Sequence, residues 1–304
     1  MLRSTLLALS QSPRVSRFVI HNKLSRRVVR RFVAGERLDD AVAAVRALNQ
    51  AGRLASLDCL GESVSSEQEA RSAAAAYSDM FDRIAKEKLT CNVSLKLTQL
   101  GLDISQPLCE ELLAEIVNRA AAQGNFVRID MESSAYTQRT LDICKRMRAH
   151  TDSVGTVIQS YLFRTEQDAR DLTAAGVRLR LVKGAYKEPA AVAFPKKSDV
   201  DANYVKVMKI LLPSGTYHGI ATHDPRMLDA TKKFAAEQGI RTDQFEFQML
   251  YGIRTDLQEQ LIREGYRLRV YVPYGSDWFP YFMRRLAERP ANLKFFLSNL
   301  FRSE

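Results

Sequence analysis

Two adjacent arginines, Arg284 and Arg285, lie in a largely apolar stretch near the end of the chain that reads VYVPYGSDWFPYFMRRLAERPAN. Adjacent residues of a helix point about 100° apart, so one arginine should share the face of Phe279 and Phe282. A guanidinium on an apolar face calls for an anion such as a carboxylate. The alternative is that both side chains extend to water from a surface helix.

Ionisable and hydrogen-bonding residues also recur at the ends of short apolar runs along the chain. They are Asp58 and Glu62, Lys96, Asp130 and Glu132, Gln159 and Tyr161, Arg180, Lys183 and Tyr186, Thr222, His223 and Asp224, Gln248 and Tyr251, and Tyr271 and Tyr274. The lysines and arginines predict a cationic site that takes an anionic ligand. The carboxylates can balance part of this charge or receive an ammonium group. A lysine at a strand end could also form a Schiff base.

Eight such runs have the length and composition of β-strands. They cover residues 54–62, 92–101, 126–133, 155–162, 177–186, 217–224, 245–252 and 266–275. Charged stretches with helical spacing lie between them, and alternating strands and helices form parallel βαβ units. Eight units in 304 residues fit a (β/α)8 barrel better than an open sheet. We therefore predict a TIM-like barrel with N-terminal helices and a C-terminal lid helix over the barrel mouth.

Such a barrel would gather the polar strand ends into one site, because the carboxyl ends of its strands meet at one rim. The last helix follows the eighth strand, so the arginine pair should reach the same site. Backbone amides of Lys183, Gly184 and Ala185 suit a phosphate or the edge of an electron-rich ring. No G-x-G-x-x-G follows a strand, so a Rossmann dinucleotide fold is not predicted.

The composition is that of an ordinary soluble globular protein, with 46% apolar and 26% charged residues. Four scattered cysteines (Cys59, Cys91, Cys109 and Cys144) indicate a reducing compartment and no disulfide framework. The four histidines show no metal-ligand spacing, so no metal site is predicted.

The net charge of +10 is concentrated in the stretch from Arg14 to Phe32, where apolar residues recur at helical spacing. We predict a cytoplasmic protein with an N-terminal helical arm (residues 1–50) and a catalytic barrel (residues 51–304). The arm would rest on the barrel or on the anionic inner face of the membrane. A mitochondrial presequence and a solvated helix face are the alternatives. The charge also allows a nucleic-acid-binding protein, but no known motif of that class is present, so no nucleic-acid partner is predicted.

Eight motifs decide between these possibilities. In chain order they are SLKLTQLG, IDMES, IQSYL, RLVKGAY, ATHD, FQMLYGIR, RVYVPYG and YFMRRLAERPAN. From Ser56 to Asn299 the chain resembles the proline dehydrogenase family of flavoproteins in its monofunctional bacterial form. The resemblance implies oxidation of L-proline to Δ1-pyrroline-5-carboxylate, the first step of proline catabolism to glutamate. It further implies hydride transfer from proline C5 to N5 of FAD and reoxidation by quinone.

The resemblance also implies roles for individual residues. Asp130 and Arg180 would be catalytic. The substrate would be bound by Lys96, Tyr271, Arg284 and Arg285, with Glu288 nearby. The cofactor would be bound by Met131, Gln159, Lys183, Gly184, Ala185, Thr222, His223 and Gln248. Two guanidinium groups on one carboxylate make planar contacts that lysine cannot reproduce, so the arginine pair is interpreted as a carboxylate clamp. A Schiff-base lyase that uses Lys96 or Lys183 is the alternative enzyme.

Overall fold

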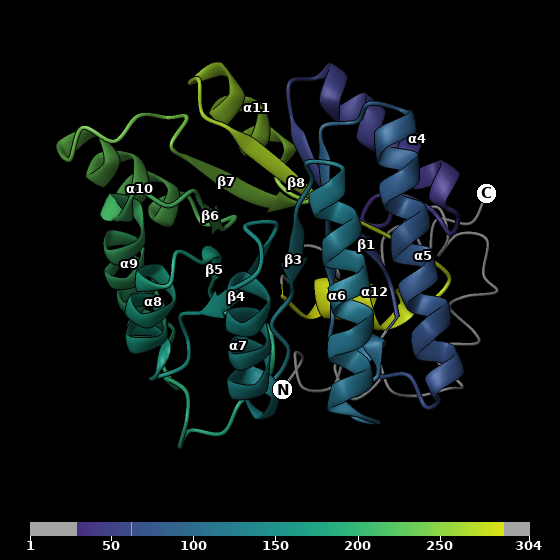
Figure 1. Cartoon of the computed structure of the whole chain (residues 1–304). Helices are drawn as coiled ribbons and strands as arrows, with labels where there is room; N and C mark the ends of the chain where they lie inside the picture. The colour runs from purple at the N-terminus through teal and green to yellow at the C-terminus, as the bar shows by residue number, and fades with distance from the viewer. Residues whose placement is uncertain (1–28, 62, 289–304) are drawn as a thin grey trace, which may run out of the picture.

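The computed structural model describes residues 29–61 and 63–288, and side chains up to residue 285. Eight parallel strands form a closed barrel in chain order (Figure 1). They are β1 (Leu54–Cys59), β2 (Cys91–Leu95), β3 (Val127–Ile129), β4 (Val154–Gln159), β5 (Arg178–Val182), β6 (His218–Ala221), β7 (Phe245–Leu250) and β8 (Leu268–Tyr274). Each strand either lies inside the run that predicted it or begins one residue before that run. The (β/α)8 prediction is therefore confirmed.

Helices follow the strands around the outside of the barrel. In the described residues they are α4 (Leu38–Gln50), α5 (Glu67–Lys86), α6 (Gln106–Ala122), α7 (Ser134–Arg148), α8 (Thr165–Ala174), α9 (Lys197–Leu211), α10 (Pro225–Glu237), α11 (Thr255–Arg263) and α12 (Trp278–Glu288). Short 3₁₀ turns lie at η1 (Thr98–Leu100) and η2 (Leu212–Ser214). Side chains of Ser66, Ser105 and Asp224 accept hydrogen bonds from backbone amides in the first turns of α5, α6 and α10, which explains where these helices begin.

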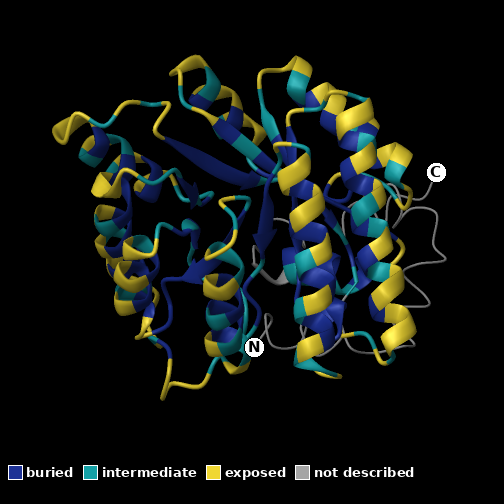
Figure 2. Cartoon of the chain, viewed as in Figure 1, coloured by how far each residue is buried: buried dark blue, intermediate teal, exposed yellow. Residues whose placement is uncertain are grey.

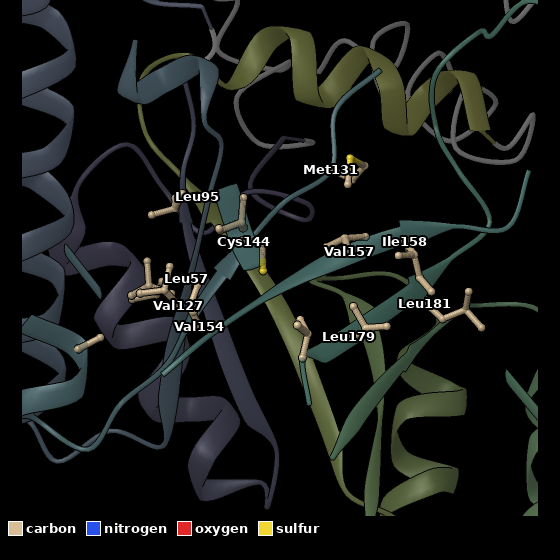
Figure 3. Close-up of a cluster of buried hydrophobic side chains, with 14 of the residues drawn as sticks. Leu57, Leu95, Val127, Met131, Cys144, Val154, Val157, Ile158, Leu179 and Leu181 are labelled. Atoms are coloured by element: carbon tan, nitrogen blue, oxygen red, sulfur yellow. The ribbon is translucent and has the colours of Figure 1, made fainter. Parts of the chain in front are cut away.

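The main hydrophobic core lies between the strands and the helices. Leu57, Leu95 and Val127, on three successive strands, belong to this core together with Cys144 of α7 (Figure 3). Figure 2 shows the same arrangement as buried strands inside helices whose outer faces are exposed. Side chains alternate between the two faces of a strand, so the neighbours of these apolar residues on the same strand face the barrel axis.

The interior of the barrel is polar. Arg180 on β5 donates hydrogen bonds to Ser94 on β2 and to Gln248 on β7, and inward-facing side chains of strands that are not neighbours in the sheet meet inside the barrel. Arg269 on β8 likewise pairs with Glu246 on β7 inside the barrel. Buried polar groups cost free energy unless they are hydrogen-bonded, so the fold depends on these partners being present.

A second apolar cluster holds α12 at the mouth of the barrel. Trp278 and Phe282 of α12 pack with Phe32 from the segment before α4, and the Phe32 and Phe282 ring centroids are 6.1 Å apart. Leu250 and Tyr271, which stand near the carboxyl ends of β7 and β8, pack against this cluster. The predicted lid helix therefore covers the rim where the strands end.

The predicted N-terminal arm is described only from residue 29 onward, so most of its basic stretch lies outside the described residues. Its last helix, α4, contributes Ala41, Val45 and Leu48 to the main core. The division of the chain at residue 50 stays a prediction. In the described ranges, no helix combines the length and the hydrophobicity needed to cross a bilayer.

Candidate active site at the barrel mouth

Arg180 is held by three acceptors from three other parts of the barrel. Its Nη1 donates to Asp130 Oδ1 at 2.7 Å, its Nε to Gln248 Oε1 at 2.5 Å, and its Nη2 to Ser94 Oγ at 3.1 Å. The side chain is 7% exposed. An arginine fixed in this way presents a permanent positive charge in one orientation near the mouth.

Asp130 links this arginine to Tyr271. The Tyr271 hydroxyl donates to Asp130 Oδ2 at 2.8 Å, so the two carboxylate oxygens have separate partners. Burial raises the pKa of Tyr271 well above its ordinary value, and the carboxylates of Asp130 and Asp58 raise it further. The phenol therefore stays a hydrogen-bond donor. Sequence reasoning predicted these three residues as site residues, and the fold brings them together.

Lys96 and Asp58 form a second buried pair beside the first. Lys96 Nζ lies 3.3 Å from each carboxylate oxygen of Asp58, which has no exposed surface. Burial raises the pKa of Asp58 more than Lys96 lowers it, and Asp130 adds to the increase. Asp58 was recognised in the sequence as a polar strand end but received no role. Its pairing with Lys96 depends on the register of β1 and β2, which the sequence does not show.

Charged residues deeper in the barrel were missed by sequence reasoning. Glu246 accepts from Arg269 Nε at 2.7 Å, from Arg269 Nη2 at 3.0 Å and from Gln248 Nε2 at 2.5 Å. A signal was present, because polar or charged residues occupy alternate positions within apolar runs, as in Glu246 and Gln248 or Arg178 and Arg180. Period-two alternation of this kind indicates a polar inner face.

Gln159 at the end of β4 has a buried acceptor without a partner. Its Nε2 donates to the Glu132 carbonyl at 3.2 Å, whereas its Oε1 has no hydrogen-bond partner in the described part of the chain. A buried carbonyl oxygen of this kind favours a ligand that offers an N–H group. Met131 follows β3, is 7% exposed and belongs to the main hydrophobic core (Figure 3).

The segment Lys183, Gly184 and Ala185 turns sharply after β5. Gly184 has φ = +114°, and a Cβ atom there would lie 2.6 Å from the Tyr161 ring, so only glycine fits. Lys183 Nζ contacts Asp201 Oδ1 at 2.5 Å and Asp224 Oδ2 at 2.8 Å. The lysine is thus tied to carboxylates at the starts of α9 and α10.

Two further cations, Lys197 and Arg226, join the same carboxylates. Lys197 Nζ is 2.7 Å from Asp201 Oδ2, and Arg226 Nη2 is 2.8 Å from Asp201 Oδ2 and 3.1 Å from Asp224 Oδ2. With Lys183, three cations share two carboxylates. The cluster therefore keeps a net positive charge of the kind that attracts phosphate groups.

Thr222 and His223 follow β6 and lie beside this cluster. Thr222 Oγ1 accepts from the Asp224 amide at 3.1 Å, and His223 Nε2 accepts from the Leu250 amide at 2.9 Å. The bond to Leu250 leaves Nδ1 as the ring nitrogen that can carry a proton. Both residues are thereby anchored to the backbone at the rim.

The arginine pair lies on α12 at the mouth. Arg285 is 8% exposed, and its guanidinium carbon is 5.1 Å from the centroid of the Tyr281 ring. Arg284 is half-buried. One arginine thus shares the buried face of the helix, as its periodicity predicted. The side chain of Glu288 lies outside the described residues.

Comparisons with known proteins agree on one family. The family model described as proline dehydrogenase matches residues 41–297. Proline dehydrogenase 1 of Bacillus subtilis is 46% identical over 300 residues, which cover 99% of each chain. Proline dehydrogenase of Deinococcus radiodurans is 39% identical over 303 residues, covering 98% of this chain and 97% of its own. The crystal structure of proline utilization A from Bdellovibrio bacteriovorus, inactivated by N-propargylglycine, is similar with a TM-score of 0.81 and 27% identity. That match covers 86% of this chain and 32% of the neighbour.

Proposed function

The chain belongs to the proline dehydrogenase family, and we propose that it oxidises L-proline to Δ1-pyrroline-5-carboxylate with bound FAD. The observation that carries this proposal is the hydrogen-bonded set of Arg180, Asp130 and Tyr271 under a helix that bears two arginines. Such a site combines fixed charges with cover from water, which an enzyme that orients a small zwitterion requires.

Arg284 and Arg285 are proposed to bind the proline carboxylate. Arg285 is buried, and a buried guanidinium is stabilised by an anion. The proline ring would then lie between α12 and the strand ends, with Lys96 and Tyr271 beside it. The nearby cations would lower the pKa of the substrate ammonium group, which must lose its proton before C5 is oxidised.

The residues at the rim fit a flavin. Gln159 Oε1 is a buried acceptor that suits the imide N–H of the ring, and the cluster around Lys183 is a net cation that suits the phosphates. When bound, the flavin supplies the acceptor for the hydride that leaves proline C5. We propose Met131, Gln159, Gly184 and Ala185 on the ring side. The phosphate and adenosine side would have Lys183, Thr222 and His223.

The electron acceptor and the location follow from the same proposal. Quinone would reoxidise the flavin, as the resemblance implies. A cytoplasmic enzyme in peripheral contact with the membrane would suit this acceptor, because the basic stretch from Arg14 to Phe32 can bind anionic lipid.

The visible spectrum of the purified protein tests the proposal. We expect flavin absorbance that bleaches when L-proline is added under anaerobic conditions and returns with a soluble quinone. A colourless protein that cannot be reconstituted with FAD would contradict the proposal, and so would a flavin that L-proline leaves oxidised.

The alternatives predict other results. A Schiff-base lyase would be trapped on a lysine by borohydride, but such a lysine must act as a neutral amine. Lys96 instead contacts Asp58, and Lys183 contacts two carboxylates. A nucleic-acid-binding protein would show tight, salt-sensitive binding to DNA or RNA.

A further inference from the structure

Gln248 has both ends of its side-chain amide held by groups inside the barrel. Its Oε1 accepts from Arg180 Nε and its Nε2 donates to Glu246 Oε1, each at 2.5 Å. An arginine only donates and a carboxylate only accepts, so the amide has one orientation. A methyl group on Gly219 of β6 would collide with this amide, so the Gln248 side chain is accommodated because position 219 is glycine.

Glu246 is in turn held as a carboxylate. Arg269 binds it through two nitrogens, and the Tyr217 hydroxyl donates to Oε2 at 3.0 Å. Burial alone would raise the pKa of Glu246, but Arg269 and the hydrogen bonds hold it below its ordinary value. The acceptor that orients Gln248 therefore keeps its charge near neutral pH.

We propose that Glu246 and Gln248 are positioning residues that fix the guanidinium of Arg180 for the reaction at the mouth. The chain of contacts runs from Arg269 through Glu246 and Gln248 to Arg180, and then through Asp130 to Tyr271. This inference rests on the proposed function, because Arg180 is proposed to act there.

Gln248 supplies the acceptor for Nε, the one guanidinium nitrogen that neither Asp130 nor Ser94 reaches. Without it, the guanidinium keeps two acceptors on one edge and can tilt about them. A tilt would displace Asp130 as well, because Arg180 and Tyr271 share its carboxylate. The resemblance implies that Gln248 contacts the cofactor directly, and the two roles predict different results.

A double-mutant cycle separates the two roles. Gln248→Met keeps the length of the side chain and removes both hydrogen bonds. We expect it to lower kcat/KM about tenfold or more in the wild-type background. With Arg180→Lys the further loss should be less than about threefold, because the group that Gln248 positions is already gone. Equal losses in the two backgrounds would overturn the proposal.

Gln159→Met is the matched control. Gln159 is also a buried glutamine near the carboxyl end of a strand, but in the described residues its Oε1 has no hydrogen-bond partner and its Nε2 donates to the Glu132 carbonyl instead of contacting Arg180. Its effect on kcat/KM should be the same in both backgrounds. Titration of the FAD-free proteins gives a second readout that needs no turnover. FAD affinity should fall in Gln159→Met and stay within about threefold of wild type in Gln248→Met. A large loss of FAD affinity in Gln248→Met would favour direct contact.

Gln248→Glu tests the same role by pH if Gln248→Met fails to fold. A protonated glutamic acid can donate to Glu246 and accept from Arg180, whereas an ionised one faces the Glu246 carboxylate. Arg180 on β5 and Arg269 on β8 contact this pair, and Arg128 on β3 and Arg178 on β5 also interact electrostatically with Glu246. The kcat/KM ratio of variant to wild type should therefore fall as pH rises, and a ratio independent of pH would overturn the proposal. If the wild-type protein neither binds FAD nor oxidises proline, or fails in either, the proposed function itself is refuted.

Discussion

Lys96 Nζ lies 3.3 Å from both carboxylate oxygens of Asp58, and the two side chains are buried together at the ends of β1 and β2. Removing one member of a buried ion pair leaves the other charge uncompensated. Asp58→Asn should therefore lower the free energy of unfolding by about 3 kcal/mol, measured by urea denaturation of the FAD-loaded protein. Glu111→Gln, which breaks an exposed pair with Arg71, is the control and should change little. Equal stability of the two variants would mean that the buried pair is not a stabilising contact.

Asp130 holds Arg180 and Tyr271 at once, so its loss should affect turnover more than folding. We expect Asp130→Ala to bind FAD and to keep its fold, because the residue follows a strand at the rim, but to lower kcat about tenfold or more. Steady-state kinetics with L-proline would measure the effect.

Asp103→Ala is a matched control for that variant. Asp103 also accepts from a tyrosine, Tyr136, at 2.8 Å and pairs with an arginine, Arg139, but it lies on the surface. Its kcat should equal that of wild type. Wild-type turnover in a folded, flavin-loaded Asp130→Ala protein would reduce Asp130 to a solvated strand end.

The arginine pair should control substrate affinity. Arg284→Ala and Arg285→Ala should each raise the KM for proline and lose about 2–4 kcal/mol in kcat/KM, because each removes a charged contact to the carboxylate. Lysine at either position should restore only part of the loss, since it cannot form the planar two-point contact. Flavin content should stay near that of wild type.

Ligands without a carboxylate provide the control for the arginine pair. Wild type should discriminate strongly against pyrrolidine in favour of proline, and both alanine variants should discriminate much less. Arg263→Ala, on an exposed turn at the end of α11, should leave KM unchanged. If KM is unchanged in both Arg284→Ala and Arg285→Ala, the clamp is wrong and the arginines extend to water.

His218 should make stability depend on pH. Burial, with Arg128 and Arg178 nearby, lowers its pKa to about 3. Below about pH 6.5, the ordinary pKa of histidine, His218 is protonated in the unfolded chain but stays neutral in the folded protein. The free energy of unfolding therefore decreases as the pH falls through about 6.5.

Lowering the pH from about 7.5 to about 5.5 should therefore reduce the free energy of unfolding by about 1.4 kcal/mol through this residue. Urea denaturation of wild type and His218→Asn at the two pH values, with FAD held at one saturating concentration, gives the difference. A pH dependence of the same size in both proteins would show that other groups carry it. His150→Asn, at an exposed position after α7, should retain the dependence.

The sequence determined the type of fold and the end of the barrel at which polar residues gather. Eight β-rich runs separated by helical stretches predicted the closed barrel, and the polar residues after each run predicted the rim, because both signals are local and repeat along the chain. Asp130, Arg180 and Tyr271 are among the residues that this pattern predicts at the rim.

Only the tertiary structure decided which of these residues meet. Arg180 and Ser94 are 86 residues apart in the chain, and Arg180 and Gln248 are 68 apart, yet each pair is hydrogen-bonded inside the barrel. Alternation along a strand shows that a side chain faces inward but not which strand stands opposite. That depends on closure of the barrel and on its register, so the pairing of Asp58 with Lys96 and the support of Arg180 by Glu246 and Gln248 follow from the folded structure alone.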